Sequence, residues 1–188
     1  MTDIQPSERN GVALDLRTLT LASLFVLCLP GVLPSGAALA TPAKDFSSVV
    51  VGPTDYGDID IKTHAGNDIQ GHAGDLKIMF ETKGPADIYN VNITVKPQGH
   101  PGWRRHPGPT LVTVARGTAA FYEADDPTCT PHVVLEHQGF VDLGEQPALV
   151  RNASTVPGDD LVLITFQIIP EGMARRIDAD APPQCPPF

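Results

Sequence analysis

Three observations predict an all-β fold, a small sandwich or jelly-roll barrel, for most of this chain. The 188 residues include 17 Gly and 19 Pro, which are too many helix-breaking residues for a helical bundle. Apolar residues make up 41% of the chain and charged residues 19%, so it is too hydrophobic to be disordered. Short segments rich in β-branched and aromatic residues recur with turn signals between them. The length suits one domain with a short extra segment.

The first segment, residues 1–40, is predicted to be an export signal. Leu19–Leu33 is an apolar run without charge, and Ala38-Leu39-Ala40 fits the small-residue pattern of a signal-peptidase site. The run is short for crossing about 30 Å of hydrocarbon, which favours a signal over a membrane anchor. Residues 1–17 are not net positive, so an uncleaved anchor and a buried helix remain alternatives. We expect cleavage after Ala40, a periplasmic, cell-wall or extracellular location, and no stable membrane span after cleavage.

The rest of the chain reads as an N-terminal arm and loop region, residues 41–75, followed by a β domain, residues 76–188. Thr41–Ser47 is expected to be a loose arm. Tyr89–Lys96 alternates between apolar odd positions and polar even positions, as in a strand with one buried face. Further strands are expected at Leu76–Phe80, Leu111–Val114, Thr118–Tyr122, Val133–Leu135, Phe140–Val141, Ala148–Val150 and Leu161–Ile169. About eight short strands at this spacing are typical of a sandwich or a jelly roll.

The cysteines predict a disulfide in the exported chain. Cys28 leaves with the signal, so Cys129 and Cys185 remain as an even pair. The bond would join the C-terminal tail to the loop at residues 125–129, and two free thiols are the alternative. Two cysteines so far apart are a poor start for a zinc site.

Charge and motifs narrow the class of function. The formal net charge is −9, and 13 basic residues are spread over the chain, which argues against nucleic acid as a partner. The sequence has no Gly-x-Ser-x-Gly, no phosphate-binding loop with Gly-Lys-Ser/Thr and no His-Glu-x-x-His. It therefore carries none of these common catalytic signatures.

The most informative stretch is residues 99–117, GHPGWRRHPGPTLVTVARG. It resembles the first motif of the cupin superfamily, and residues 139–152 resemble the second. The segments Gly-Trp-x-x-His-Pro-Gly-Pro, Asp-Pro-Thr-Cys and Cys-Pro-Pro-Phe are similar to those of a subgroup of small bacterial cupin-domain proteins, some with export signals. The resemblance covers about residues 76–188 and implies a small jelly-roll (cupin) barrel.

The resemblance also implies a metal site, but most of its ligands are replaced. The family pattern puts the first His at Arg104, the second at His106 and the acidic ligand at Thr110, while the second motif puts a ligand at Pro147 or Ala148. A guanidinium stays protonated and only donates, so Arg104 repels a cation where a His would bind one. We expect a degenerate site with no cofactor.

A divalent metal held by His106 with non-standard ligands is the alternative. His100, His132 or His137 would have to supply them.

The same replacement predicts a site for an anion or carboxylate. Arg104 can grip such a group with two parallel hydrogen bonds, and Trp103 could supply an apolar wall, although a Trp in a small β domain often belongs to the core. Arg105 should point away from Arg104 along the strand. The pocket candidates are Arg104, His106, Trp103, Thr110 and His100.

We therefore expect a non-catalytic exported domain that binds a small molecule or a protein. The alternatives are a vestigial pocket and a metal-dependent oxygenase or isomerase using His106. A homodimer using Thr41–Val51 as a shared strand is left open.

Overall fold

The computed structural model describes residues 40–65 and 76–188, and all helices and strands assigned within these residues are the β-strands β1 to β12. The predicted export signal, apart from Ala40, lies outside the described residues. The described part of the chain holds no helix long and apolar enough to cross a membrane.

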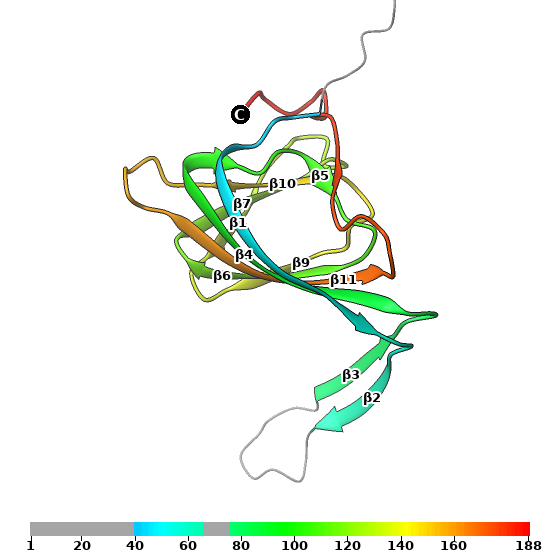
Figure 1. The fold of residues 1–188 in the computed structure, drawn as a ribbon. Coiled ribbons are helices and arrows are strands. Elements are labelled where there is room, and N and C mark those ends of the chain that lie inside the picture. Colours follow the sequence, from blue (N-terminus) through cyan, green and yellow to red (C-terminus); the bar gives the residue numbers. More distant parts are fainter. Residues whose placement is uncertain (1–39, 66–75) are drawn as a thin grey trace, which may run out of the picture. The chain divides into compact units, whose positions relative to one another are not determined.

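Two five-stranded antiparallel sheets build the fold (Figure 1). The first sheet has the order β1–β4–β11–β6–β9 and the second the order β12–β5–β10–β7–β8. The bounds of the first sheet are β1 Lys44–Tyr56, β4 Ala86–His100, β11 Leu161–Pro170, β6 Thr110–Arg116 and β9 Gly139–Asp142. Those of the second are β12 Ile177–Asp178, β5 Arg104–Arg105, β10 Ala148–Asn152, β7 Thr118–Glu123 and β8 His132–Leu135. β2 (Asp60–Ala65) and β3 (Leu76–Glu81) pair with each other in a separate two-stranded sheet.

The order of the strands is that of a jelly roll. β4 pairs with β11, β5 with β10, β6 with β9 and β7 with β8. This is the pairing of one long hairpin that is rolled up so that successive strand pairs fall alternately in the two sheets. A double-sheet fold of eight such strands is the jelly-roll architecture that cupins share. The predicted all-β jelly-roll class is confirmed.

β1 departs from the expected loose arm and loop region at residues 41–75. It begins at Lys44 and pairs with β4 from Lys44 opposite His100 to Tyr56 opposite Ala86, within its own chain. Nearly all of its residues are exposed, so it lacks the alternation of buried and exposed positions by which a strand is found in a sequence. Main-chain hydrogen bonds to β4 make this segment part of the barrel, although its side-chain pattern does not indicate a strand.

The inward-facing residues change from apolar to polar at one end of the barrel. The buried positions of β11 include Leu163, Thr165 and Gln167, and those of β6 are Val114, Val112 and Thr110. The register places Leu163 opposite Val114 and Gln167 opposite Thr110. The apolar core therefore gives way to buried polar side chains at the same level of two neighbouring strands. That level holds the candidate site.

Candidate functional site

A cavity of about 270 Å³ lies at this polar level, on the inner side of the first sheet. The residues that line it come from β1, β4, β5, β6, β11 and the segments next to them. They are Ala43, Phe46, Ser48, Val91, Ile93, Arg104, His106, Thr110, Thr165, Gln167, Arg175 and Arg176. Three of these described residues are arginines and none is Asp or Glu. The cavity is therefore lined by positive charge.

Arg104 is the most deeply buried of the charged groups. It lies on β5, is 8% exposed, and donates from Nη1 to the carbonyl oxygen of Gly102 at 3.2 Å. Within the described residues it forms no ion pair and no other side-chain hydrogen bond. Burial, followed by the charge of Arg176, lowers the pKa of Arg104 to about 10, so the group is still a cation at neutral pH.

Apart from the bond to Gly102, the N–H donors of Arg104 have no acceptor among the described residues. A guanidinium has five N–H donors, and a buried charge without a partner is costly. Arg105, the next residue on β5, is exposed, so the two side chains separate as the strand pattern predicts. The remaining donors of Arg104 are suited to an anion that enters the cavity.

His106 is held in one tautomer by the main chain. Its Nδ1 lies 2.6 Å from the carbonyl oxygen of Arg175. A carbonyl only accepts, so Nδ1 carries the proton and donates, and Nε2 bears the lone pair of the neutral ring. Burial, and then the charge of Arg104, lower the pKa of His106, which favours this neutral form. Gln167 Nε2, itself a donor, lies 3.1 Å from the same Nδ1 and does not hydrogen-bond to it in this tautomer. It donates to Thr110 Oγ1 at 3.4 Å.

The other two arginines come from the chain between β11 and β12. Arg175 donates from Nη1 to Gln167 Oε1 at 3.4 Å, and burial lowers its pKa. Arg176 is already engaged, because Nε donates to Asp178 Oδ1 at 2.5 Å and Nη2 to the carbonyl oxygen of Pro101 at 2.7 Å. Arg104 and Arg175 are therefore the cations best placed to contact a ligand.

The structure brings three of the five pocket candidates together. Arg104, His106 and Thr110 line the cavity, and Trp103 and His100 do not. Trp103 is fully buried in a second apolar cluster with Ala120, Tyr122, Cys129 and Leu149. Phe46, Val91 and Ile93 line the cavity with apolar surface instead.

His100 packs on the far side, against Phe188, with 6.3 Å between the ring centroids. Its Nδ1 accepts a hydrogen bond from the Gly102 N–H at 3.2 Å. Burial lowers the pKa of His100. His100 is not among the lining residues, and its ring packs against the C-terminal Phe188.

Sequence reasoning missed Gln167, Arg175 and Arg176. The sequence itself could have indicated Gln167, because it is a polar residue at an inward position of the apolar strand Leu161–Ile169. No comparable signal exists for the two arginines. Their position depends on how the chain returns to pair β12 with β5.

These residues do not fit a resident metal. Within residues 40–65 and 76–188, no three or more His, Cys, Asp or Glu side chains are grouped so that they could hold an ion. His106 is the one imidazole among the described lining residues, and the Arg104 cation lines the same cavity. His132 and His137, the expected substitute ligands, are exposed and lie 3.5 Å from Glu123 and Glu136.

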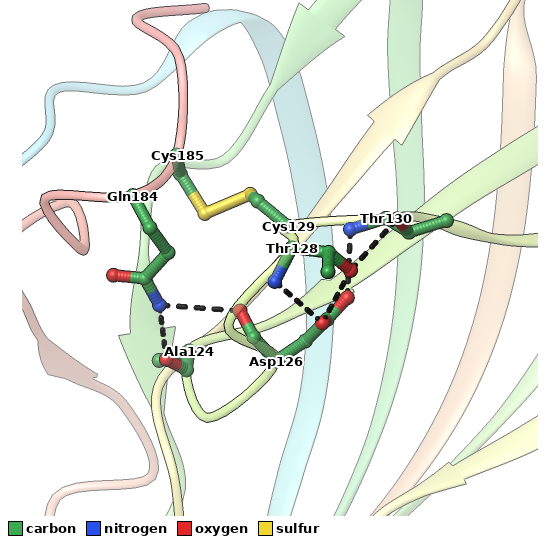
Figure 2. Close-up of a disulfide and its surroundings, with 7 residues drawn as sticks. All are labelled: Ala124, Asp126, Thr128, Cys129, Thr130, Gln184 and Cys185. Carbon is green, nitrogen blue, oxygen red and sulfur yellow. Dashed lines mark hydrogen bonds between the residues drawn. A yellow bond between two sulfur atoms is a disulfide. The ribbon is translucent and has the colours of Figure 1, made fainter.

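A disulfide anchors the tail that follows the two arginines. Cys129 and Cys185 are joined, with 5.3 Å between their Cα atoms (Figure 2). Next to the bond, Gln184 Nε2 donates to the carbonyl oxygens of Ala124 at 2.8 Å and Asp126 at 3.2 Å. The pair predicted from the cysteine count is therefore formed, and it fixes the tail to the loop after β7.

Comparison with models of known protein families and with curated proteins finds no match. Among solved structures, the chain is similar to a conserved protein with a double-stranded β-helix domain from Klebsiella pneumoniae, with 14% identity over 69% of this chain and 85% of that one and a TM-score of 0.41. It is also similar to a cupin-like protein from Thermotoga maritima, with 17% identity, coverage of 51% and 65%, and a TM-score of 0.39. A cupin superfamily protein from Desulfitobacterium hafniense matches with 10% identity, coverage of 44% and 67%, and a TM-score of 0.38.

The chain thus spans about two thirds of the length of the last two proteins. At these identities and TM-scores the likeness says nothing about chemistry. The fold assignment rests on the strand order.

Proposed function

We propose that this protein is an exported, non-catalytic jelly-roll domain that binds a small anion, in particular a carboxylate, in the cavity beside Arg104. The observation that carries the proposal is the buried Arg104 cation, which has no ion-pair partner among the described residues. An Arg–carboxylate contact is charge-assisted and can be bidentate, so such a ligand would offset the cost of burying the cation.

The chemistry of the lining residues supports binding over catalysis. His106 is the one imidazole of the cavity, and no Asp, Glu or Cys accompanies it among the described lining residues, so the hydroxyls there have no second base beside them and no set of metal ligands is present. The proposal therefore includes no cofactor.

Export is supported by the signal pattern and by the disulfide, because disulfides persist in oxidising compartments. The expected product is a chain that begins at Thr41 and has no free thiol. Intact-mass analysis of the protein recovered outside the cytoplasm, with and without thiol alkylation, tests both points.

A screen of small anions tests the binding function. Acetate, phosphate and sulfate are compared with chloride at constant ionic strength, with the melting temperature as the readout. A ligand at about 100 times its dissociation constant stabilises the folded state by about 2.7 kcal/mol. The shift should vanish in Arg104→Gln and persist in Arg105→Gln, which removes an exposed arginine of the same strand. No shift with any anion would overturn the proposal.

A metal-dependent oxygenase or isomerase is the second candidate. The observation that favours it is the neutral His106 ring, whose Nε2 is not occupied by the main-chain contact. This candidate requires near-stoichiometric Fe, Mn, Ni or Zn in the purified protein, since the chemistry would run through the metal. Metal content below about 0.1 per chain would exclude it.

A homodimer stays a prediction, now with the exposed edge of β1 as its expected site.

A further inference from the structure

The walls of the cavity divide by polarity across the first sheet. On the side of β1 and β4, Phe46, Val91 and Ile93 present apolar groups beside a single hydroxyl, that of Ser48, and Val91 and Ile93 belong to the core cluster. On the side of β11, β6 and β5, the lining is polar and cationic. The change occurs between neighbouring strands, where Val91 of β4 lies opposite Thr165 of β11. A ligand that fills this cavity must satisfy both kinds of surface.

We infer that the ligand is an amphiphilic monocarboxylate, with its carboxylate at Arg104 and a short aliphatic or aromatic tail against Phe46, Val91 and Ile93. This inference rests on the proposed anion site and names the class of anion. A carboxylate has both oxygens at one end and can turn its tail to the apolar wall. Phosphate and sulfate carry oxygens on all sides, so this wall would leave some of them desolvated without a hydrogen bond.

The size of the cavity limits the tail. A cavity of about 270 Å³ has room for a compact ligand such as benzoate, butyrate or pentanoate. The volume lies just below the roughly 300–1,000 Å³ of sites for drug-sized ligands. Small aryl and alkyl carboxylates therefore fit.

Several hydrogen-bond donors of the cavity are available to the carboxylate of the ligand. Arg104 and Arg175 supply N–H donors, and Thr110 supplies a hydroxyl that already accepts from Gln167 Nε2 and is free to donate its proton. No described residue of the lining is acidic, and Asp142 and Asp178 act on Arg104 by charge without forming an ion pair with it. An alcohol of the same shape would lack the charge that Arg104 needs.

Titration calorimetry with acetate, butyrate, pentanoate, benzoate, benzyl alcohol and inorganic phosphate tests the inference on the full chain. Each buried methylene contributes about 0.8 kcal/mol, so affinity should rise up to about fourfold per methylene from acetate to pentanoate. Benzoate should bind at least about tenfold more tightly than acetate, phosphate and benzyl alcohol. Equal affinity across the carboxylates, or tighter binding of phosphate, would overturn the inference.

A variant of the apolar wall localises the tail. Phe46→Ala should weaken the binding of benzoate and leave that of acetate unchanged, because only the tail contacts this ring, although Val91 and Ile93 still contact the tail. Val49→Ala, on the same strand but 65% exposed, is the control and should change neither affinity. A Phe46→Ala protein that binds benzoate as the wild type does would contradict the assignment.

The two proposals fail differently. If acetate and phosphate bind in an Arg104-dependent way but the tail adds nothing, the anion site stands and the amphiphilic class is wrong. If no anion binds, both are wrong.

Discussion

Arg104 is buried as a cation and uses one of its N–H donors within the described protein. Removing a charge from water costs several kcal/mol unless a partner replaces the water, so we expect Arg104 to lower the stability of the empty fold. Asp142 acts on Arg104 through its charge without forming an ion pair, and its Oδ1 accepts from the Gly144 N–H at 2.8 Å. We interpret Arg104 as a residue retained for its ligand.

His106 gives a prediction about pH. Its pKa is lowered in the folded state by burial first, while the unfolded chain takes up a proton near the ordinary value of 6.5. The unfolded state therefore binds more protons as the pH falls through 6.5, and stability decreases below that value, by at most about 1.4 kcal/mol per pH unit for this group. In His106→Gln, the loss of melting temperature between about pH 7.5 and about pH 5.5 should be smaller than in the wild type.

His100 contributes in the same direction, because burial also lowers its pKa, so part of the pH dependence should remain in His106→Gln. His137→Gln, which removes an exposed ring, serves as the control and should leave the profile unchanged. A His106→Gln profile identical to that of the wild type would show that the ring is not held neutral.

At the scale of elements, the C-terminal segment completes the site. The chain leaves β11, places Arg175 and Arg176 at the cavity, pairs β12 with β5 and is then fixed by Cys185. The segment contributes both side-chain charge and the main-chain oxygen that orients His106. A change that makes this segment more mobile should lower both the affinity of the site and the stability of the fold.

Removing the disulfide should therefore have two effects. Cysteines 56 residues apart close a loop worth about 4 kcal/mol in the chain-entropy model, less any strain. Cys129→Ser with Cys185→Ser should lower the free energy of unfolding by about 2–4 kcal/mol in urea titrations and weaken carboxylate binding. If stability falls but the affinity at a temperature where the variant is folded stays that of the wild type, the tail is not needed for the site.

Gly144 packs against the connection between β5 and β6, which contains His106. Its φ is +77°, and a Cβ there would collide with the carbonyl oxygens of His106 and Gly108. Gly158 has a φ of +91° but open space around it, so it isolates the cost of the backbone conformation. Gly158→Ala should cost about 1–2 kcal/mol, and Gly144→Ala about 1–3 kcal/mol more and some carboxylate affinity. Equal melting temperatures for the two variants would argue against this packing.

At the scale of the whole molecule, the class of fold was predictable because strands with one buried face are visible in the sequence. The alternation at Tyr89–Lys96 is found in β4, where Val91, Ile93 and Val95 are buried and Asn90 and Asn92 exposed. The pairing of β1 with β4 of its own chain was not predicted, since the segment was expected to be a loose arm or a strand shared between subunits, and it is exposed along almost its whole length. Its place depends on main-chain pairing at the edge of a sheet.

The candidate site was predictable only in part, for a related reason. Arg104, His106 and Thr110 lie close together in sequence, within one turn and the strand after it. Arg175 and Arg176 reach the cavity through the return of the chain to β5, which no local pattern encodes. Trp103 was expected near the ligand because it is next to Arg104, but it packs into another cluster.

The central claim is that Arg104 is buried for a ligand, so its value to the protein depends on whether an anion is present. The most direct measurement is the free energy of unfolding of the wild type and of Arg104→Met, each without ligand and with a saturating concentration of benzoate. Replacing a buried ion pair with apolar residues of similar volume is often neutral or stabilising by about 1–4 kcal/mol, and we extend this expectation to the unpaired Arg104 charge. We predict that Arg104→Met is at least as stable as the wild type without ligand, and that benzoate stabilises only the wild type, so that the order reverses. An Arg104→Met protein that is less stable without ligand, or that benzoate stabilises as much as the wild type, would contradict the claim.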